Sequence, residues 1–346
     1  MPGMDDLGHA TATGEHSGST KTRELGFTYA LFGGVIHSSI PLPELRPVDS
    51  DVWDWHFEVV DELEPAREVR TMGSMQMYAE IYSRTYAHAA GYRVEVDDTG
   101  VFDVSADGTF IRHRPRADPW WDFGRAHLLG QVMAISLQIR SVITLHASAV
   151  ETRDGVIGFL APKHFGKTTL SLILTREGAR FVTDDTLPVQ LGDPPLALPG
   201  VQSLRVLADN EEAKELIRGA FGAPVRLESA NRDGKIRTPP LPLPRILSRA
   251  RKLEALYLLQ PVRAGDGGES VERLPTHGPE AVANVLGQTK IGGVLGPGFV
   301  PDLLRQVSGI ARQVPVYRLR IVRDLERLPE VAERLLSWHG TPGEVT

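Results

Sequence analysis

A Gly-Lys-Thr triplet at positions 166–168 contains the residue types in this sequence that are best suited to bind phosphate. A turn with exposed backbone N–H groups can surround a polyphosphate, a lysine can reach its outer phosphates, and a hydroxyl can hold Mg²⁺. A helix that begins near Lys167 adds the positive end of its dipole. The segment VIGFLAPKHFGKTT at 156–169 therefore predicts a loop that binds ATP together with Mg²⁺. The expected nucleotide-binding residues are Ala161, Pro162, Lys163, His164, Phe165, Gly166, Lys167, Thr168 and Thr169.

This loop departs from the pattern GxxxxGK[ST] at its first position, where Ala161 replaces glycine. At its apex, His164 and Phe165 stand where a backbone close to phosphate usually tolerates little bulk. Two interpretations stay open. Either the loop binds nucleotide with reduced affinity, or it works normally while these two side chains point away and contact the base, the acceptor or a partner.

The order of elements around the triplet favours a phosphate site. An apolar run of strand length precedes the loop, and apolar residues at helical spacing follow it as far as Gly178, a helix terminator. A second strand then ends on Asp184 and Asp185, where phosphoryl transfer calls for a Mg²⁺ ligand and a proton acceptor. Taken singly, Lys167 could be an ordinary helix-start lysine and the acidic pair a strand-ending turn. Their conjunction predicts a site.

Composition limits the classes of function. The chain has 346 residues, 41% of them hydrophobic and 24% charged, which is typical of a globular protein with one large or two medium domains; we expect two. No apolar run approaches the roughly 20 residues that cross a bilayer, and no secretion signal is visible, so we expect a cytoplasmic location. The absence of cysteine excludes disulfides and a cysteine nucleophile. A net charge of −6 argues against general nucleic-acid binding.

The pattern along the chain predicts three regions. Residues 1–22 are rich in Gly, Ser, Thr and His and should be disordered, whereas 23–118 contain short alternating runs that predict a β-rich N-terminal domain. Asp118 as N-cap and Pro119 predict a helix from Trp120 to about Ile139, leading into an α/β domain over 119–340. The expected strands of that domain are 142–150, 156–160, 179–182, 187–190, 253–259 and 314–321, and further helices are expected at 209–220 and 328–338. The polar, proline-rich segment 228–244 could close over a site.

The histidines do not have the spacing of metal ligands. For most of them we expect ordinary surface or helix-face positions: His37, His56, His88, His113, His127, His277 and His339. The sequence also shows no His/Lys group of the kind that would hold a second metal.

Three segments resemble the catalytic core of the HPr kinase/phosphorylase-like family: LHASAV at 145–150, APKHFGKTT at 161–169 and GARFVTDD at 178–185. His146 lies fifteen residues before Ala161 and Asp184 lies sixteen after Thr168, as in the family pattern. Segments 30–45 and 314–329 are similar to stand-alone members, some of which resemble kinases of ribosomal-peptide clusters, including those of lasso peptides. The resemblance implies an α/β fold with a P-loop core of the HPr kinase/phosphoenolpyruvate carboxykinase type, preceded by the β-rich domain.

The resemblance also implies roles for individual residues. Lys167 would neutralise the β and γ phosphates, Thr168 would ligate Mg²⁺, and Asp184 would accept the proton of the acceptor hydroxyl. Asp185 would help to hold the metal, and His146 would orient the carboxylates or the phosphoryl group, unless it is a buried structural histidine. Additional candidates for stabilising the transferred charge are Arg205, Lys235 and Arg237.

The sequence thus leads to a kinase hypothesis and a non-catalytic alternative. The first is a Mg-ATP-dependent kinase that phosphorylates an alcohol hydroxyl, preferably a serine of a peptide or protein such as a ribosomal-peptide precursor, or else a small hydroxyl compound. The alternative is a nucleotide-binding regulatory or scaffold protein without phosphotransfer. Carboxykinase-type decarboxylation ranks below both because no second metal site is visible. Neither a nucleic acid nor a membrane is an expected partner, and a homo-oligomer is compatible with the resemblance.

Overall fold

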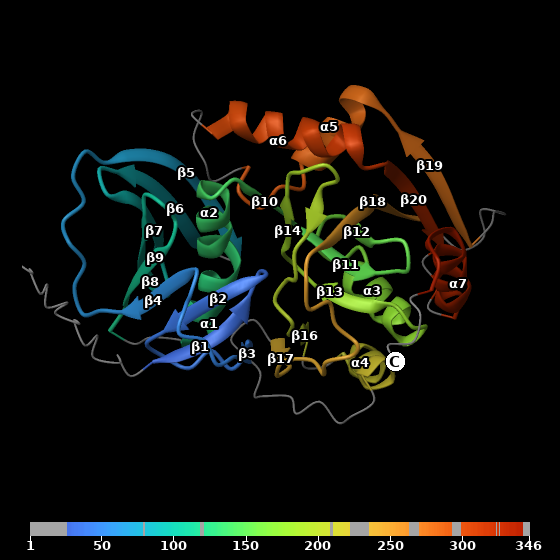
Figure 1. The fold of residues 1–346 in the computed structure, drawn as a ribbon, viewed down its shortest axis with the longest axis horizontal. Coiled ribbons are helices and arrows are strands. Elements are labelled where there is room, and N and C mark those ends of the chain that lie inside the picture. The colour runs from blue at the N-terminus through green and yellow to red at the C-terminus, as the bar shows by residue number, and fades with distance from the viewer. Residues whose placement is uncertain are drawn as a thin grey trace, which may run out of the picture.

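The computed structural model describes residues 26–78, 80–117, 121–207, 210–221, 235–262, 270–292, 299–322, 324 and 326–341. The tail predicted to be disordered, the predicted N-cap Asp118 with Pro119, and residues 222–234 of the long loop region lie outside this part. The described chain folds around two large β-sheets, which form two lobes side by side (Figure 1). We call residues 26–139 the N-terminal lobe and residues 142–341 the C-terminal lobe.

The N-terminal lobe contains a nine-stranded sheet in the order β3-β1-β2-β4-β9-β8-β7-β6-β5. Its strands are β1 (Phe27–Leu31), β2 (Gly34–Ser38), β3 (Arg46–Pro47), β4 (Trp55–Val59), β5 (Arg70–Tyr78), β6 (Ile81–His88), β7 (Gly91–Val96), β8 (Gly100–Ser105) and β9 (Phe110–Pro115). The pairs β2/β4 and β4/β9 are parallel, and the other neighbours are antiparallel. The alternating runs of the sequence therefore form strands, as predicted.

A helical segment covers this sheet and faces the C-terminal lobe (Figure 1). It consists of α1 (Trp121–His127), a π-helical turn (Leu128–Val132) and α2 (Met133–Ile139). Leu128 and Met133 are fully buried in one cluster with Ile36 and Phe102 of the sheet. The predicted helix is confirmed from residue 121 onward, but its π-helical turn was not predicted. The domain boundary expected between residues 118 and 119 stays a prediction, and the segment after it packs on the N-terminal sheet.

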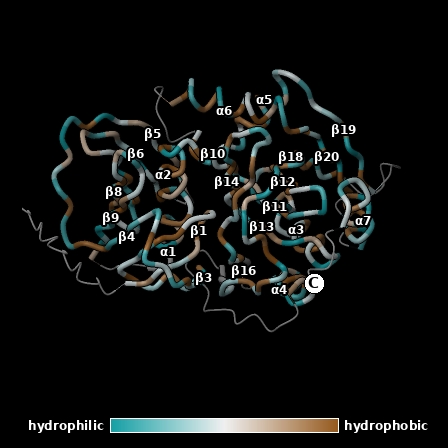
Figure 2. The backbone as a smooth tube through the Cα atoms, in the orientation of Figure 1, coloured by the Kyte–Doolittle hydropathy of each residue, from teal (hydrophilic) through white to brown (hydrophobic). Residues whose placement is uncertain are grey.

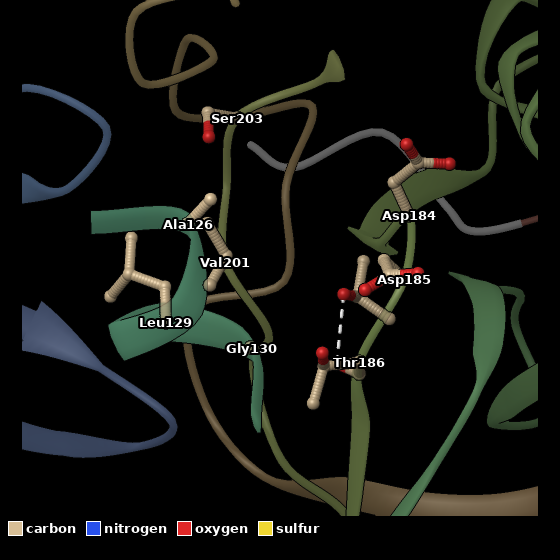
Figure 3. A pocket seen from close by; sticks show the side chains of 9 residues that line it. Ala126, Leu129, Gly130, Asp184, Asp185, Thr186, Val201 and Ser203 are labelled. Carbon is tan, nitrogen blue, oxygen red and sulfur yellow. Dashed lines mark hydrogen bonds between the residues drawn. The ribbon is translucent and has the colours of Figure 1, made fainter. Parts of the chain in front are cut away.

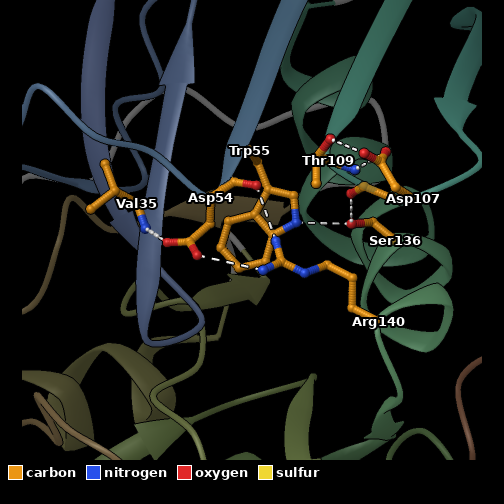
Figure 4. A network of polar contacts seen from close by, with 8 residues as sticks. Val35, Asp54, Trp55, Asp107, Thr109, Ser136 and Arg140 are labelled. Atoms are coloured by element: carbon orange, nitrogen blue, oxygen red, sulfur yellow. Dashed lines mark hydrogen bonds and ion pairs between the residues drawn. The ribbon is translucent and has the colours of Figure 1, made fainter. Parts of the chain in front are cut away.

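Polar contacts fix α2 against the sheet (Figure 4). The Trp55 indole donates to Ser136 Oγ at 2.9 Å, and Ser136 Oγ donates to the Gly108 carbonyl at 2.6 Å. At the end of the helix, Arg140 donates to the Asp54 carbonyl at 3.0 Å. The buried donors of Trp55 and Ser136 thus have partners, which avoids the desolvation cost of an unpaired polar group. The position of the helical segment is therefore set by the N-terminal lobe.

The C-terminal lobe contains the second sheet, with the order β10-β14-β15-β18-β12-β11-β13 and with β20 pairing β18 and β19. Its strands are β10 (Val142–Leu145), β11 (Ala147–Glu151), β12 (Val156–Leu160), β13 (Arg180–Thr183), β14 (Leu187–Gln190), β15 (Leu196–Ala197), β18 (Arg251–Val262), β19 (Val271–Thr276) and β20 (Val316–Val322). Strand β18 runs parallel to β12 and β20. A separate small sheet pairs β16 (Arg205–Leu207) with β17 (Lys235–Arg237).

One predicted strand was wrong in extent. The run 142–150 forms two strands that part at His146, because β10 pairs with β14 whereas β11 pairs with β12 and β13. At the break, the His146 N–H donates to the Gln288 carbonyl at 2.7 Å. This contact comes from a segment far along the chain, so local residue patterns did not reveal it.

Helices cover both faces of the second sheet (Figure 1). They are α3 (Lys167–Arg176), α4 (Glu211–Phe221), α5 (Gly278–Leu286), α6 (Val300–Gln313) and α7 (Leu328–His339). Residues of α3 and α7 share one hydrophobic cluster with the sheet, and residues of α5 and α6 share another. The sequence predicted α3, α4 and α7 but not α5, α6 or β19. Among the described helices, none is long and apolar enough to cross a bilayer.

Hydropathy follows this arrangement (Figure 2). Hydrophobic residues lie on the inner strands and on the helical segment between the lobes, whereas the loop between β4 and β5 is mostly hydrophilic. Two histidines contradict the expected surface or helix-face positions, since His37 and His113 are buried in strands at 7% and 2% exposure. His127 and His339 lie on helices, as expected, but are also buried.

Burial of His113 predicts a pH-dependent stability. Desolvation lowers the pKa of His113 from 6.5 to about 4. A hydrogen bond of 3.1 Å to the Thr99 carbonyl raises this pKa but does not outweigh the desolvation. Below pH 6.5 the unfolded chain binds a proton at this position that the folded chain does not, so stability falls as pH falls toward 4. The expected loss is about 2 to 3 kcal/mol.

Urea unfolding at pH 7 and at pH 4.5 measures this contribution. His113→Leu should make the change in unfolding free energy between the two pH values smaller by about 2 kcal/mol, whatever its effect on absolute stability. The control is His277→Leu, because His277 is exposed before α5. An unchanged pH dependence in His113→Leu would contradict the assignment.

Candidate functional site

The loop between β12 and α3 has the backbone geometry of a tight turn into a helix. Gly166 precedes α3 with φ +87°, in the left-handed region that glycine adopts without strain. Ala161, the residue that departs from the motif, is 2% exposed, and its methyl group belongs to the hydrophobic cluster shared by α3 and α7. The extra Cβ is therefore accommodated in the core. Strand, loop and helix follow each other as predicted.

The two bulky residues at the loop apex lie on the surface. His164 has φ +69°, an uncommon and strained conformation for a non-glycine residue, and its side chain is exposed. Phe165 is 41% exposed. Neither side chain packs into the core, which agrees with the interpretation in which they point outward. Contact of His164 or Phe165 with the base, the acceptor or a partner stays a prediction.

Lys167 begins α3 and is largely buried. Its Nζ donates to the carbonyls of Ala161 at 2.7 Å and Pro162 at 3.2 Å, so the ammonium lies inside the turn. Desolvation lowers the pKa of Lys167, although the charges of Asp185 and Asp184 oppose this shift. The carbonyl of Lys167 accepts a hydrogen bond from Ser148 Oγ at 2.8 Å, which ties the start of the helix to β11.

The predicted hydroxyl and one predicted carboxylate meet directly. Thr168 Oγ1 donates to Asp184 Oδ1 at 2.5 Å, which joins the first turn of α3 to the residue after β13. Gly200 packs closely against Thr183, the last residue of β13. A Cβ added at position 200 would lie only 2.4 Å from Thr183 Cβ, so the close approach requires glycine. The segment that follows Gly200 is thereby held close to the acidic pair.

Asp185 is surrounded by two cationic or potentially cationic side chains. His146 Nε2 lies 3.3 Å from Asp185 Oδ1, and the Lys290 ammonium contacts Asp185 Oδ2. Lys290 Nζ also donates to Thr186 Oγ1 at 2.6 Å. Desolvation opposes ionisation of Asp185, but the Lys290 charge and the His146 hydrogen bond outweigh it and hold the pKa of Asp185 well below its usual range. Its side chain is nevertheless 59% exposed and open to a ligand.

Lys290 is the site residue that the sequence analysis missed. It lies 105 positions from Asp185, after α5, in a segment whose composition gives no signal of a site. Backbone contacts place it there, because Lys290 N–H donates to the Thr144 carbonyl at 2.9 Å and Thr289 forms a bridge to Leu145. His146 and Lys290 both contact Asp185, an arrangement that the sequence did not reveal.

The remaining predicted candidates lie on the small sheet. The backbone of Arg205 pairs with that of Arg237, and Leu207 pairs with Lys235. The side chains of Arg205, Lys235 and Arg237 lie outside the described part of the structure, so their roles stay predictions. In the described part of the chain, no group of three or more His, Asp or Glu side chains is placed to hold a metal ion.

A small cavity opens beside the acidic pair (Figure 3). Its volume is about 60 Å³. The helical segment forms one wall, residues 183–186 form another, and Val201 and Ser203 close it from the segment after Gly200. The acidic pair therefore lies between the loop of α3 on one side and this cavity on the other.

Comparisons with known proteins do not show a family. No protein-family model matches the chain, and no curated protein sequence matches it. Among solved structures, the chain is similar to the Hpr(Ser) kinase/phosphatase from Coxiella burnetii, with 14% sequence identity over 57% of this chain and 95% of that chain, and a TM-score of 0.30. A likeness with this sequence identity and TM-score does not show a family. The family that the motifs indicate therefore stays a prediction.

Proposed function

We propose that this protein is a Mg-ATP-dependent kinase of the HPr kinase/phosphorylase-like kind, which transfers the γ-phosphoryl group to an alcohol hydroxyl. The acceptor that we favour is a serine of a peptide or protein, such as a ribosomal-peptide precursor. The observation that supports this most strongly is the 2.5 Å contact between Thr168 and Asp184 beside Lys167, at the first turn of α3. A helix N-terminus, an ammonium, a hydroxyl and carboxylates thus converge on one spot.

The donor groups fit magnesium and a triphosphate. Mg²⁺ takes oxygen ligands and is usually held by one or two carboxylates together with substrate phosphates. Thr168 and Asp185 would supply such oxygens, and the pKa of Asp185, well below its usual range, keeps that carboxylate anionic. When bound, magnesium neutralises charge on the phosphates during transfer. Lys167, already desolvated, would gain a strong partner in an anionic phosphate.

The remaining roles follow from position. Asp184 would accept the hydroxyl proton, since it lies next to Thr168 and lines the cavity on the far side. His146 would orient Asp185 through the 3.3 Å contact, and Lys290 would balance its charge from the other oxygen. Residues 162–169 would surround the phosphates with backbone N–H groups. Catalysis of this type is mostly positioning and electrostatic stabilisation.

Titration calorimetry with Mg-ATP and Lys167→Ala tests the nucleotide site. Loss of a charge-assisted hydrogen bond should weaken binding roughly tenfold or more. Lys252→Ala serves as the control because Lys252 is half-exposed and pairs with Glu254 at the start of β18, away from the loop. Equal affinities of wild type and Lys167→Ala would count heavily against a phosphate site here.

Phosphotransfer is tested separately by mass spectrometry after incubation with Mg-ATP and serine peptides, serine-containing proteins or free serine. A product 80 Da heavier, the mass of one added HPO₃ group, supports the kinase. Tight Mg-ATP binding without any phosphorylated acceptor would favour the regulatory or scaffold alternative.

A further inference from the structure

Residues 288–291, which follow α5, are bound to the backbone of the C-terminal lobe beside the acidic pair. The Gln288 carbonyl accepts a hydrogen bond from the His146 N–H at 2.7 Å. Two residues later, the Lys290 N–H donates to the Thr144 carbonyl at 2.9 Å. These bonds fix the backbone of the segment. They do not fix the ammonium of Lys290, because a long lysine side chain has several rotatable bonds.

Ile291, the next residue, is buried in the other lobe. Its side chain is fully buried in the hydrophobic cluster that includes Leu128 and Leu129 of the helical segment and Phe102 of the N-terminal sheet. Among the described residues, Ile291 is the one fully buried member of this cluster that the C-terminal lobe contributes. Because removing a methyl or methylene group from such a core leaves a cavity, the N-terminal lobe holds this side chain in place.

The side chain of Lys290 lies between the two lobes. Its Nζ contacts Asp185 Oδ2 and donates to Thr186 Oγ1 at 2.6 Å. It also lies beside the helical segment, since a Cβ added at Gly130 would be 3.9 Å from Lys290 Nζ. Only 14% of the side chain is exposed. The ammonium is therefore confined by the N-terminal lobe as well as by the turn that contains Asp185.

The two neighbouring residues thus connect the core of one lobe to the acidic residues of the other. Ile291 has a hydrocarbon side chain without charge or hydrogen-bonding groups, so it can affect the charge at Asp185 only through the position of other groups. Lys290 is bonded to it directly. A shift of Ile291 moves the Lys290 backbone, and a displacement of about 1 Å within a site can lower a rate about 100-fold.

We propose that Ile291 is a positioning residue, which holds the Lys290 ammonium on Asp185 because its own side chain is packed in the core of the N-terminal lobe. The charge balance at the acidic pair then depends on the contact between the two lobes. The effect of Ile291 on catalysis rests on the proposed kinase function, whereas its effect on the position of Lys290 does not.

Ile291→Ala removes the packed side chain, and Ile111→Ala is the matched control. Ile111 is also fully buried in the same cluster but lies on β9 of the N-terminal sheet. Both substitutions remove the same atoms from the same core, so thermal unfolding should show comparable losses of stability. Ile291→Val and Ile111→Val form a milder pair for the same comparison if an alanine variant does not fold.

Labelling of amines with acetic anhydride, read by mass spectrometry, reports the position of Lys290 without any need for activity. Lys252 in the same sample serves as the reference, because 53% of its side chain is exposed, against 14% for Lys290. In the wild type, Lys290 should react more slowly than Lys252. In Ile291→Ala, the rate of Lys290 relative to Lys252 should rise severalfold, whereas in Ile111→Ala this ratio should stay at the wild-type value.

Steady-state kinetics with a serine peptide and Mg-ATP measure the catalytic consequence. Ile291→Ala should lower kcat at least about tenfold, with the same division of the effect between kcat and KM as in Lys290→Met. The double variant of Ile291→Ala and Lys290→Met should have the kcat of Lys290→Met within about twofold, because a residue that acts through Lys290 has no further effect once that ammonium is gone. Ile111→Ala should keep a kcat close to that of the wild type.

The outcomes separate this inference from the proposed function. Equal labelling of Lys290 in Ile291→Ala and in the wild type overturns the positioning role, and so does faster labelling without any loss of kcat. A loss of kcat that persists undiminished in the Lys290→Met background overturns it as well. If the wild type binds Mg-ATP but phosphorylates no acceptor, the kinase function fails, and the labelling ratio still decides whether Ile291 holds Lys290 in place.

Discussion

Asp184→Asn is expected to lower phosphotransfer about 10³-fold while Mg-ATP affinity stays within about threefold. The asparagine side chain keeps an oxygen that can accept the hydrogen bond from Thr168 Oγ1, so the 2.5 Å link between α3 and the turn after β13 can persist. The asparagine amide cannot take up the hydroxyl proton of the alcohol that receives the phosphoryl group. The substitution therefore separates proton transfer from nucleotide binding at one position.

Single-turnover kinetics with a serine acceptor and calorimetry with Mg-ATP measure the two quantities independently. Asp302→Asn is a suitable control, because Asp302 lies exposed on α6 and pairs with Arg305 of the same helix. Phosphotransfer at the wild-type rate in Asp184→Asn would remove this residue from the role of proton acceptor. A parallel loss of nucleotide affinity would instead indicate that Asp184 acts mainly in binding.

Lys290→Met is expected to lower kcat for phosphotransfer about 100-fold, the usual cost of removing one preorganised charge from such a site. Lys290 contacts Asp185 and Thr186, so its loss removes the ammonium from Asp185 and leaves the contact with His146. That carboxylate then lies next to the negative charges of a triphosphate without its ammonium partner. Because Lys290 comes from the segment after α5, the effect also tests whether that segment belongs to the site.

Rescue by arginine distinguishes this role from simple stabilisation. Lys290→Arg keeps the positive charge and should retain most of kcat, although the geometry of its donors differs. Thermal unfolding of both variants shows whether the fold is kept, and KM for Mg-ATP shows whether binding is affected. Equal kcat in Lys290→Met and wild type would contradict a role of Lys290 at the site. A loss explained entirely by unfolding would contradict it equally.

Much of the candidate site could be predicted from short stretches of sequence. The strand β12, the turn at Gly166 and the start of α3 at Lys167 depend on neighbouring residues, since an apolar run, a glycine and helical spacing act over a few positions. The acidic pair after β13 could be read in the same way. These features could be recognised without the fold because the backbone conformations that produce them are local.

The secondary structure expected from the sequence was less accurate where a segment pairs with residues far along the chain. The run 142–150 has the composition of one strand, yet it parts at His146 because the neighbours of β10 and β11 differ and because Gln288 binds the backbone at the break. The π-helical turn inside the predicted helix likewise had no visible sequence signal. Strand pairing and helix irregularity depend on contacts that single-sequence patterns do not contain.

Local sequence was thus sufficient to place the turn at which we propose that phosphate binds, since Gly166, Lys167 and Thr168 adopt their positions through neighbouring backbone. The surroundings of that chemistry required the folded chain. Lys290 reaches Asp185 across 105 positions, and Gly130 faces the acidic pair from the other lobe. The physical reason is that charge balance and cavity shape depend on which distant side chains lie within a few ångströms, and packing of the two lobes sets those distances.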